Sequence, residues 1–357
     1  MKRVLTLLFA LLLVSSLLLA ACAPAPEEAV EEPAAAEEMA AEEAAPAEEA
    51  PAEEAAPVEE AAPAPEEVTV VIGFTSSITG KQEVSSKRQV NGFNLWMEQV
   101  NAAGGVTLSD GTVVKFEYVT YDDESTAERV QELYTRLISE DNANFLISPY
   151  SSGLTSAASI VAEQNGKVMI TTGAADDSTY KTGNTGLFQL YTPGSLYMSS
   201  TVDMLQELDP DAKIALVYEA DKFSTSVVEG IKPYLAERGF EVVLEESYAS
   251  DTADFGPIVN KIAGSGATVL LGGGHYNDGT ALARSLYERQ IGLNFAYLLV
   301  APADSKFPEL GDAALGIAVS SQWELAATHT EAEAANLGMD WFGPTGEDFA
   351  AAYEVAA

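Results

Sequence analysis

The sequence predicts an α/β fold in which parallel sheets, covered by helices, form two similar lobes. Short runs rich in β-branched and aromatic residues alternate with helical patterns after residue 67. This alternation is typical of parallel sheets with helices on both faces. The strand–helix series runs to about Tyr191 and restarts at Lys213. The roughly 290 residues involved are enough for one large or two medium domains.

The elements can be placed in order along the chain. A strand is expected at 68–74, where β-branched residues dominate, and a helix at 86–100, where large apolar residues follow helical spacing. The best-marked helix covers 125–138, because Ser125 and Glu128 are expected to form a capping box ahead of an apolar stripe. The other expected strands lie at 113–119, 144–148, 168–171, 214–218, 241–246, 268–271 and 295–300.

The N-terminus has the features of a lipoprotein signal peptide. Two basic residues precede a Leu-rich run at 4–20, which polar residues interrupt and which is shorter than a comfortable transmembrane span of roughly 20 residues. Residues 19–22, Leu-Ala-Ala-Cys, resemble the lipobox of bacterial lipoproteins. This resemblance implies a signal peptide at 1–21 and a lipid on Cys22. An ordinary signal peptide with an incidental cysteine is the alternative.

Residues 22–67 are predicted to be a disordered linker that begins at the lipidated cysteine. After Cys22 they consist almost wholly of Ala, Glu and Pro, with 16 Glu and neither Lys nor Arg. Such a segment repels itself and cannot bury enough apolar surface to fold. The whole chain carries a formal net charge of −37, which argues against a nucleic-acid partner. With one cysteine no intrachain disulfide is possible, so stability must come from an apolar core.

Candidate ligand-binding residues follow the predicted strands, because open α/β sheets bind ligands at the carboxyl ends of their strands. Ser151 and Ser152 fall at the N-cap of a predicted helix, where hydroxyls and free backbone N–H groups suit a ligand carboxylate. Plain helix capping explains them equally well. Small residues at 171–177 follow the next strand and allow close backbone approach. The matching second-lobe junctions lie at 218–224, 272–278 and 300–304.

Several motifs argue against metal, cofactor or enzyme chemistry. The Gly run at 272–274 lacks the ending of a P-loop and the spacing of a dinucleotide fingerprint. His275 has no Cys or second His nearby, so the sequence favours a surface or pocket-wall role over metal ligation. The acids at 122–124 are interpreted as solvent-exposed charges in the first turn of a helix. The sequence contains no Gly-x-Ser-x-Gly elbow, and no Ser-His-Asp set can be assigned.

A series of short motifs resembles the type I periplasmic-binding-protein family, in its Leu/Ile/Val-receptor-like branch that serves ABC importers. The resemblance runs in order from Val68 to about Trp323, and no single motif carries it alone. Its landmarks are Ile78-Thr-Gly80, the run at 101–106, Asp122-Asp-Glu-Ser125, Pro149-Tyr-Ser-Ser-Gly153, Thr172-Gly-Ala174, Ile214-Ala-Leu-Val-Tyr218, Arg238-Gly-Phe240 and Gly311-Asp-Ala-Ala-Leu-Gly316.

The resemblance implies two Rossmann-like lobes joined by a multi-strand hinge. Lobe 1 is expected at 68–190 and lobe 2 at 191–319, with a return to lobe 1 at 320–357. The crossovers are expected near 191–195 and 320–322. The chain ends inside a helix-like run where family members continue, so the return to lobe 1 is expected to be incomplete and the C-terminus truncated.

The resemblance also implies the site. In this family, first-lobe serine and small-residue loops take an amino-acid carboxylate, while second-lobe side chains wall the pocket and meet the ammonium. Phe223 stands where family members often have tyrosine, so it offers no hydroxyl. By position, the expected ligand-binding residues are Ser151, Ser152, Gly173, Ala174, Phe223, Tyr276 and Asp304.

The predicted function is that of an extracytoplasmic solute-binding protein without catalytic activity, cofactor or metal. It is expected to capture a small polar ligand, an amino acid of the branched-chain type or a related solute, between its lobes and deliver it to ABC permease subunits. We expect a monomer, held at the outer face of the cytoplasmic membrane by Cys22. A ligand-sensing receptor of the same fold and a Rossmann-like enzyme are the alternatives.

Overall fold

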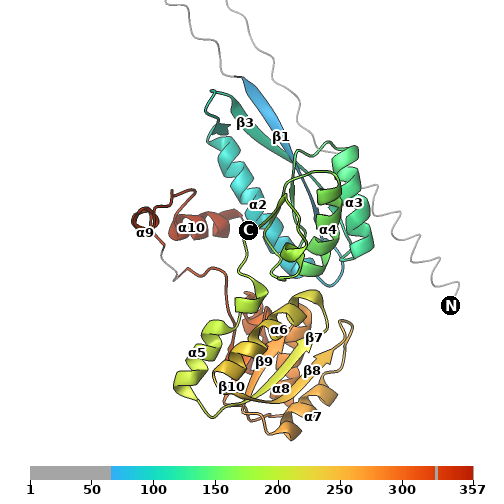
Figure 1. The fold of residues 1–357 in the computed structure, drawn as a ribbon, viewed down its shortest axis with the longest axis vertical. Coiled ribbons are helices and arrows are strands. Elements are labelled where there is room, and N and C mark those ends of the chain that lie inside the picture. Colours follow the sequence, from blue (N-terminus) through green and yellow to red (C-terminus); the bar gives the residue numbers. More distant parts are fainter. Residues whose placement is uncertain (1–65, 326–328, 357) are drawn as a thin grey trace, which may run out of the picture. The chain divides into compact units, whose positions relative to one another are not determined.

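The computed structural model describes residues 66–325 and 329–356 (Figure 1). The predicted signal peptide, Cys22 and nearly all of the Ala/Glu/Pro linker lie outside the described residues. Within the described part of the chain, no helix has both the length and the hydropathy needed to cross a membrane. The α/β fold with two lobes of mostly parallel sheets, predicted from the sequence, is confirmed.

The first sheet has six strands in the order β2-β3-β1-β4-β5-β6. Strand β1 pairs in parallel with β3 along its whole length, from Glu67 opposite Val113 to Ser76 opposite Asp122. Only the two-residue β2 at the edge runs antiparallel. The strands are β1 (Glu67–Ser76), β2 (Val106–Thr107), β3 (Val113–Asp122), β4 (Phe145–Ile147), β5 (Met169–Thr171) and β6 (Leu187–Gln189).

Helices α2 (Glu83–Ala102), α3 (Ala127–Ser139) and α4 (Ser152–Gln164) accompany this sheet. The apolar stripe of α3 packs with β4 and α4 in one buried cluster, in which Tyr134 and Leu146 are fully inaccessible. Each large apolar side chain buried in this way contributes about 1.5–3 kcal/mol to folding. The stripe predicted from the sequence is therefore part of the core of this lobe.

The second sheet has five parallel strands in the order β11-β10-β9-β7-β8. Strand β7, which lies between β9 and β8, is buried from Ile214 to Glu219, as expected of a parallel strand covered on both faces. The strands are β7 (Lys213–Glu219), β8 (Glu241–Tyr248), β9 (Val269–Gly273), β10 (Phe295–Leu298) and β11 (Ile317–Ala318). The accompanying helices are α5 (Ser199–Leu208), α6 (Lys222–Glu237), α7 (Gly256–Ser265) and α8 (Tyr276–Glu288).

The chain segment that follows the first sheet, after β6, runs beside the segment that follows the second sheet, after β11. The Thr192 backbone N–H donates to Gln322 Oε1 at 2.9 Å, and the Ser320 hydroxyl donates to the Tyr197 carbonyl at 2.7 Å. After the second sheet come α9 (Glu331–Asn336) and α10 (Gly346–Ala356), and α10 contacts α2 of the first lobe. The lobe limits placed at 190 and 319 stay predictions.

Two expectations for the turn before α3 are wrong. The helix begins at Ala127 after an N-cap at Thr126, and Ser125 forms no capping box but adopts a φ of 56° and donates to the Thr79 carbonyl. Asp123, expected in solvent, is fully buried. It accepts hydrogen bonds from the hydroxyls of Thr75 and Ser77, which tie the ends of β1 and β3 together. Burial raises the pKa of the Asp123 carboxyl, although these donors act against the shift.

Candidate functional site

The candidate site lies where loops from the two sheets meet. In the first sheet β1 lies between β3 and β4, and in the second β7 lies between β8 and β9. At these positions consecutive connections depart in opposite directions, which opens a crevice beyond the carboxyl ends of the strands. Lys81, after β1, places its ammonium 3.1 Å from Glu219 at the end of β7. Tyr150, after β4, places its hydroxyl 3.1 Å from Nδ1 of His275, after β9.

The first-lobe side of this crevice is built from hydroxyl, amide and backbone groups. The Gln89 amide, on α2, donates to the Ser148 carbonyl at 2.6 Å and to the Thr172 hydroxyl at 2.8 Å. A Cβ on Gly173 would lie 2.8 Å from Gln89 Oε1 and 3.0 Å from Tyr150 Cδ2, so a larger residue here would displace the Gln89 amide. Gln89 Oε1 and the Ser148 hydroxyl are buried without a hydrogen-bond partner among the described residues. Buried polar atoms of this kind call for a partner, such as a bound solute.

The other predicted first-lobe residues surround this corner. Ser151 is the N-cap of α4, as expected, but its side chain makes no capping hydrogen bond. The Ser152 hydroxyl is buried and accepts the backbone N–H groups of Ala175 and Asp176, both at 3.1 Å. Ala174 is buried too, and its carbonyl accepts a hydrogen bond from the Tyr180 hydroxyl. Ser152 therefore joins the loops after β4 and β5, whereas the Ser151 hydroxyl forms no hydrogen bond with another residue in the described part of the chain.

The predicted second-lobe residues do not all come together. Phe223 is buried, with its ring centroid 5.4 Å from that of Tyr197 and 5.5 Å from that of His275. Tyr276 is partly buried and packs against an apolar cluster that α8 forms with β9 and β10. Asp304 is buried and forms an ion pair of 2.6 Å with Arg88 of α2. The acid expected to meet a ligand ammonium thus already has a cationic partner from the first lobe.

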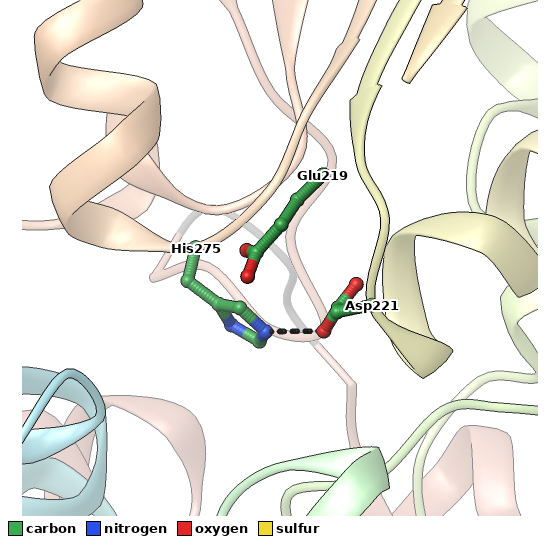
Figure 2. Close-up of side chains that lie close together, drawn as sticks. All are labelled: Glu219, Asp221 and His275. Atoms are coloured by element: carbon green, nitrogen blue, oxygen red, sulfur yellow. Dashed lines mark hydrogen bonds and ion pairs between the residues drawn. The ribbon is translucent and has the colours of Figure 1, made fainter. Parts of the chain in front are cut away.

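His275 is the centre of a charged group that the sequence did not reveal (Figure 2). Its Nε2 lies 2.8 Å from Asp221 Oδ2, and donor atoms of Glu219, Asp221 and His275 all lie within 4.8 Å of one another. Strand β7 ends at Glu219, Asp221 caps α6, and His275 caps α8. Asp278 accepts the His275 backbone N–H at 2.8 Å. The structure thus places His275 in the pocket wall, one of the two roles the sequence favoured.

The electrostatics of this group follow from burial and the short distances. Burial lowers the pKa of the His275 imidazole, but the Asp221 hydrogen bond and the charges of Asp221, Glu219 and Asp278 outweigh it, so the pKa is raised. Burial raises the pKa of Asp221, but His275 and the Ser224 N–H outweigh it and lower that pKa. Burial, with the charge of Glu219, raises the pKa of Asp278. The second-lobe side of the crevice is therefore strongly electronegative.

A further ion pair and a cleft lie on the side of the crevice near the crossovers. Lys222, the first residue of α6, places its ammonium 3.6 Å from Asp176 and 3.1 Å from the Ser156 hydroxyl, both of the first lobe. Beside it, a cleft of about 590 Å³ is lined by residues of the loop after β5 and of α6. These residues include Asp176, Asp177, Lys181, Lys222, Ser226 and Glu229.

The comparisons with known proteins agree with this architecture. Residues 69–354 match a family model described as periplasmic binding protein. An amino acid binding protein of Pseudomonas aeruginosa is 26% identical over 226 residues, which are 63% of this chain and 59% of that protein. The Leu/Ile/Val-binding protein homolog 7 of Brucella abortus is 27% identical over 222 residues, 60% of this chain and 54% of that protein. The match therefore spans less than two thirds of these relatives.

Solved structures share the fold at low sequence identity. The branched-chain amino acid transporter substrate-binding protein LivJ of Streptococcus pneumoniae, in complex with isoleucine, aligns with a TM-score of 0.63 at 21% identity. That alignment covers 81% of this chain and 82% of LivJ. A solute-binding protein of an R. palustris ABC transporter, in complex with benzoate, aligns with a TM-score of 0.67 at 19% identity and covers 81% and 74%.

Proposed function

The chain belongs to the periplasmic binding protein family, and from this premise we propose that it binds a small carboxylate-bearing solute, most specifically an amino acid, between its lobes. The observation that carries the proposal is the meeting of the two crevices, with Tyr150 of one lobe against His275 of the other. Crevices at such positions are where open α/β sheets bind small molecules. The solute would bridge the lobes in place of some of the direct contacts between them.

The chemistry of the first-lobe corner supports a carboxylate at Ser151. This residue caps α4, where the free backbone N–H groups and the helix dipole favour an anion. The partnerless Ser148 hydroxyl can donate to the same carboxylate, and the partnerless Gln89 Oε1 can accept from an ammonium or hydroxyl. Relatives named for amino-acid binding support the amino-acid class over others.

The remaining parts of the proposal concern delivery and position. Members of this family act outside the cytoplasm, and we propose that this chain hands its solute to ABC permease subunits. A lipid on Cys22 would hold it at the outer face of the membrane, with residues 22–67 as the tether. Binding without turnover is proposed, because the family and its structural neighbours are solute-binding proteins.

Isothermal titration calorimetry with a panel of amino acids and aromatic acids, benzoate included, tests the ligand class. We expect saturable heat from at least one α-amino acid and none from the matching amines that lack a carboxylate. Mass spectrometry of the recovered solute should show it unchanged. The absence of heat from every amino acid at millimolar concentration would reject the amino-acid assignment, and binding of benzoate alone would replace it with an aromatic acid.

The variant Ser151→Ala tests whether the carboxylate of the solute binds at Ser151. Because a hydroxyl bonded to a charged group contributes about 1–3 kcal/mol, the variant should bind the solute at least several-fold more weakly. Thermal unfolding should change little, since the Ser151 hydroxyl makes no capping hydrogen bond. Ser152→Ala is the matched comparison, because its hydroxyl holds two backbone N–H groups and its loss should lower stability. Unchanged affinity in Ser151→Ala would move the carboxylate elsewhere.

A further inference from the structure

We propose that Glu219, Asp221 and His275 form a binding site for one divalent transition-metal ion, carried by the second lobe alone. The proposal goes beyond solute capture and does not depend on it. Figure 2 shows the two carboxylates and the imidazole turned toward one another from three separate elements. Their donor atoms lie within 4.8 Å of one another. Donors around one ion are separated by roughly 3–4 Å when the metal–ligand bonds are about 2 Å, so small side-chain movements complete the site.

The hydrogen bonds around these donors turn His275 Nε2 and Asp221 Oδ2 toward each other, so an ion would replace the bond of 2.8 Å between them. The hydroxyl of Tyr150 engages Nδ1 of His275, so that Nε2 faces the carboxylates. The Ser224 backbone N–H holds Asp221 Oδ1 at 2.7 Å, so that Oδ2 is the oxygen that faces His275 and would face the ion. Supporting partners of this kind fix the tautomer of a metal-binding imidazole and orient a ligating carboxylate. The three side chains are therefore oriented for metal binding by their hydrogen bonds, beyond being close in space.

A glycine and an adjoining cavity leave space for the ion and for water. A Cβ on residue 274 would lie 2.6 Å from Glu219 Oε2 and 2.3 Å from Asp278 Oδ2, so Gly274 is what lets these carboxylates sit side by side. A cavity of about 160 Å³ adjoins Glu219, His275 and Asp278. Three protein ligands with an open position filled by water are a common arrangement for zinc and related ions.

The charge balance also favours a cation here. Glu219, Asp221 and Asp278 carry three carboxylates, and the ammonium that reaches them belongs to Lys81, 3.1 Å from Glu219. The Lys81 side chain is 43% exposed and can turn into solvent when an ion binds, whereas the Glu219 side chain is 3% exposed and cannot. An imidazole with two carboxylates selects zinc, cobalt or nickel over calcium and magnesium, which prefer oxygen donors alone.

The test is titration of tag-free protein, without added solute, with Zn²⁺ by calorimetry and with Co²⁺ by visible absorption. We expect one ion per chain and Co²⁺ ligand-field bands. His275→Gln should weaken Zn²⁺ binding at least tenfold, because a ligand is lost. His329→Gln is the matched control, since His329 is the other histidine of the chain and is exposed. Equal affinity in the two variants would overturn the proposal.

A second variant keeps the test independent of folding. Lys81→Met removes the cation that competes for Glu219 and, because the side chain is partly exposed, should leave the fold intact. Zn²⁺ binding should become several-fold tighter, whereas a merely structural cluster would show no gain. The site would be rejected if Ca²⁺ bound as tightly as Zn²⁺, or if neither variant changed the affinity for Zn²⁺. Either result would mean that the ions bind only as counterions to an acidic protein. Solute calorimetry repeated with EDTA separates this failure from failure of the proposed function.

Discussion

The two lobes meet with unlike surfaces. The first lobe offers cations from the β1–α2 region, Lys81 and Arg88, beside a corner of neutral groups around Gly173. The second lobe offers buried acids, and Glu219 and Asp304 each pair with one of those cations. The pair of Lys222 with Asp176 is reversed in sign and lies on the side of the crevice near the crossovers. This difference supports the proposal that the first lobe binds the anionic end of a solute, and the three ion pairs join the two lobes beside that position.

The largest expected effect tests whether the backbone is packed more tightly around β9 of the second lobe than around β1 of the first lobe. In Gly272→Ala the new Cβ would lie 1.8 Å from the Val217 carbonyl oxygen, at a φ of 151°. Because backbone must move, the free energy of unfolding should fall by about 3 kcal/mol. In Gly73→Ala of β1 the clash, 2.8 Å, is with the Ala143 side chain, so the loss should be smaller.

Urea unfolding of both variants measures this difference. Gly264→Ala in α7 is the control, because a Cβ there meets no atom within 4 Å and alanine suits a helix better than glycine. If Gly73→Ala lowers the free energy of unfolding as much as Gly272→Ala does, the two strands are packed equally tightly.

The fold was predictable because its signals are local. Alternation of buried strands and helices depends on neighbouring residues: the expected strand at 214–218 lies within β7, and the one at 268–271 overlaps β9 except for its first residue. The turn at Ser125 was misassigned because a capping box and a turn with positive φ share the same residue types. The conformation of this turn depends on hydrogen bonds that buried Asp123 accepts from Thr75 and Ser77. These contacts join distant parts of the chain, so no local pattern predicts them.

The site was only partly predictable, because its partners are far apart in sequence. The loops after the strands, which the sequence favours as ligand-binding positions, do approach one another, but His275 is 54 residues from Asp221 and 125 from Tyr150. No local pattern encodes such pairs. The same limit applies to Asp304, where sequence alone could not show the Arg88 guanidinium that now neutralises it. Whether Asp304 serves a solute stays a prediction.

The next effect concerns that pair. Arg88→Met leaves the Asp304 carboxylate, 3% exposed, without its cation. Loss of one partner of a buried pair is strongly destabilising, but the Arg88 side chain is 40% exposed, so we expect a loss of about 1–2 kcal/mol after allowing for solvent screening. Thermal unfolding measures it, and Arg88→Met combined with Asp304→Asn should recover most of the loss. A double variant as unstable as the single one would show that packing, and not charge, is what Arg88 contributes.

A smaller effect tests the neutral contact between the crevices. Tyr150→Phe keeps the ring but removes the hydroxyl that meets His275, so stability should fall by about 0.5–1.5 kcal/mol. A double-mutant cycle with His275→Gln isolates the contribution of this hydrogen bond. Strictly additive losses in the cycle would mean that the two side chains do not interact across the lobes in solution.

The smallest effect is a pH dependence at the crossover, where the two lobes share one carboxylate. Asp177 accepts hydrogen bonds from the backbone N–H and the hydroxyl of Ser195 at 2.9 Å, and a third from the Ser226 hydroxyl. Burial raises its pKa, but these donors and the charge of Lys181 outweigh burial, so the pKa lies below 3.8.

A lowered carboxyl pKa stabilises the fold above the unfolded value of 3.8, and this contribution is lost as the pH falls through the folded value. Asp177→Asn cannot titrate, so it should be less stable than the parent by up to about 1 kcal/mol at pH 7. The gap should close below pH 3.8. Urea unfolding across this pH range measures it, with the exposed Asp251→Asn as control. A gap that stays constant down to pH 3 would mean that Asp177 acts through hydrogen-bond geometry and not through its charge.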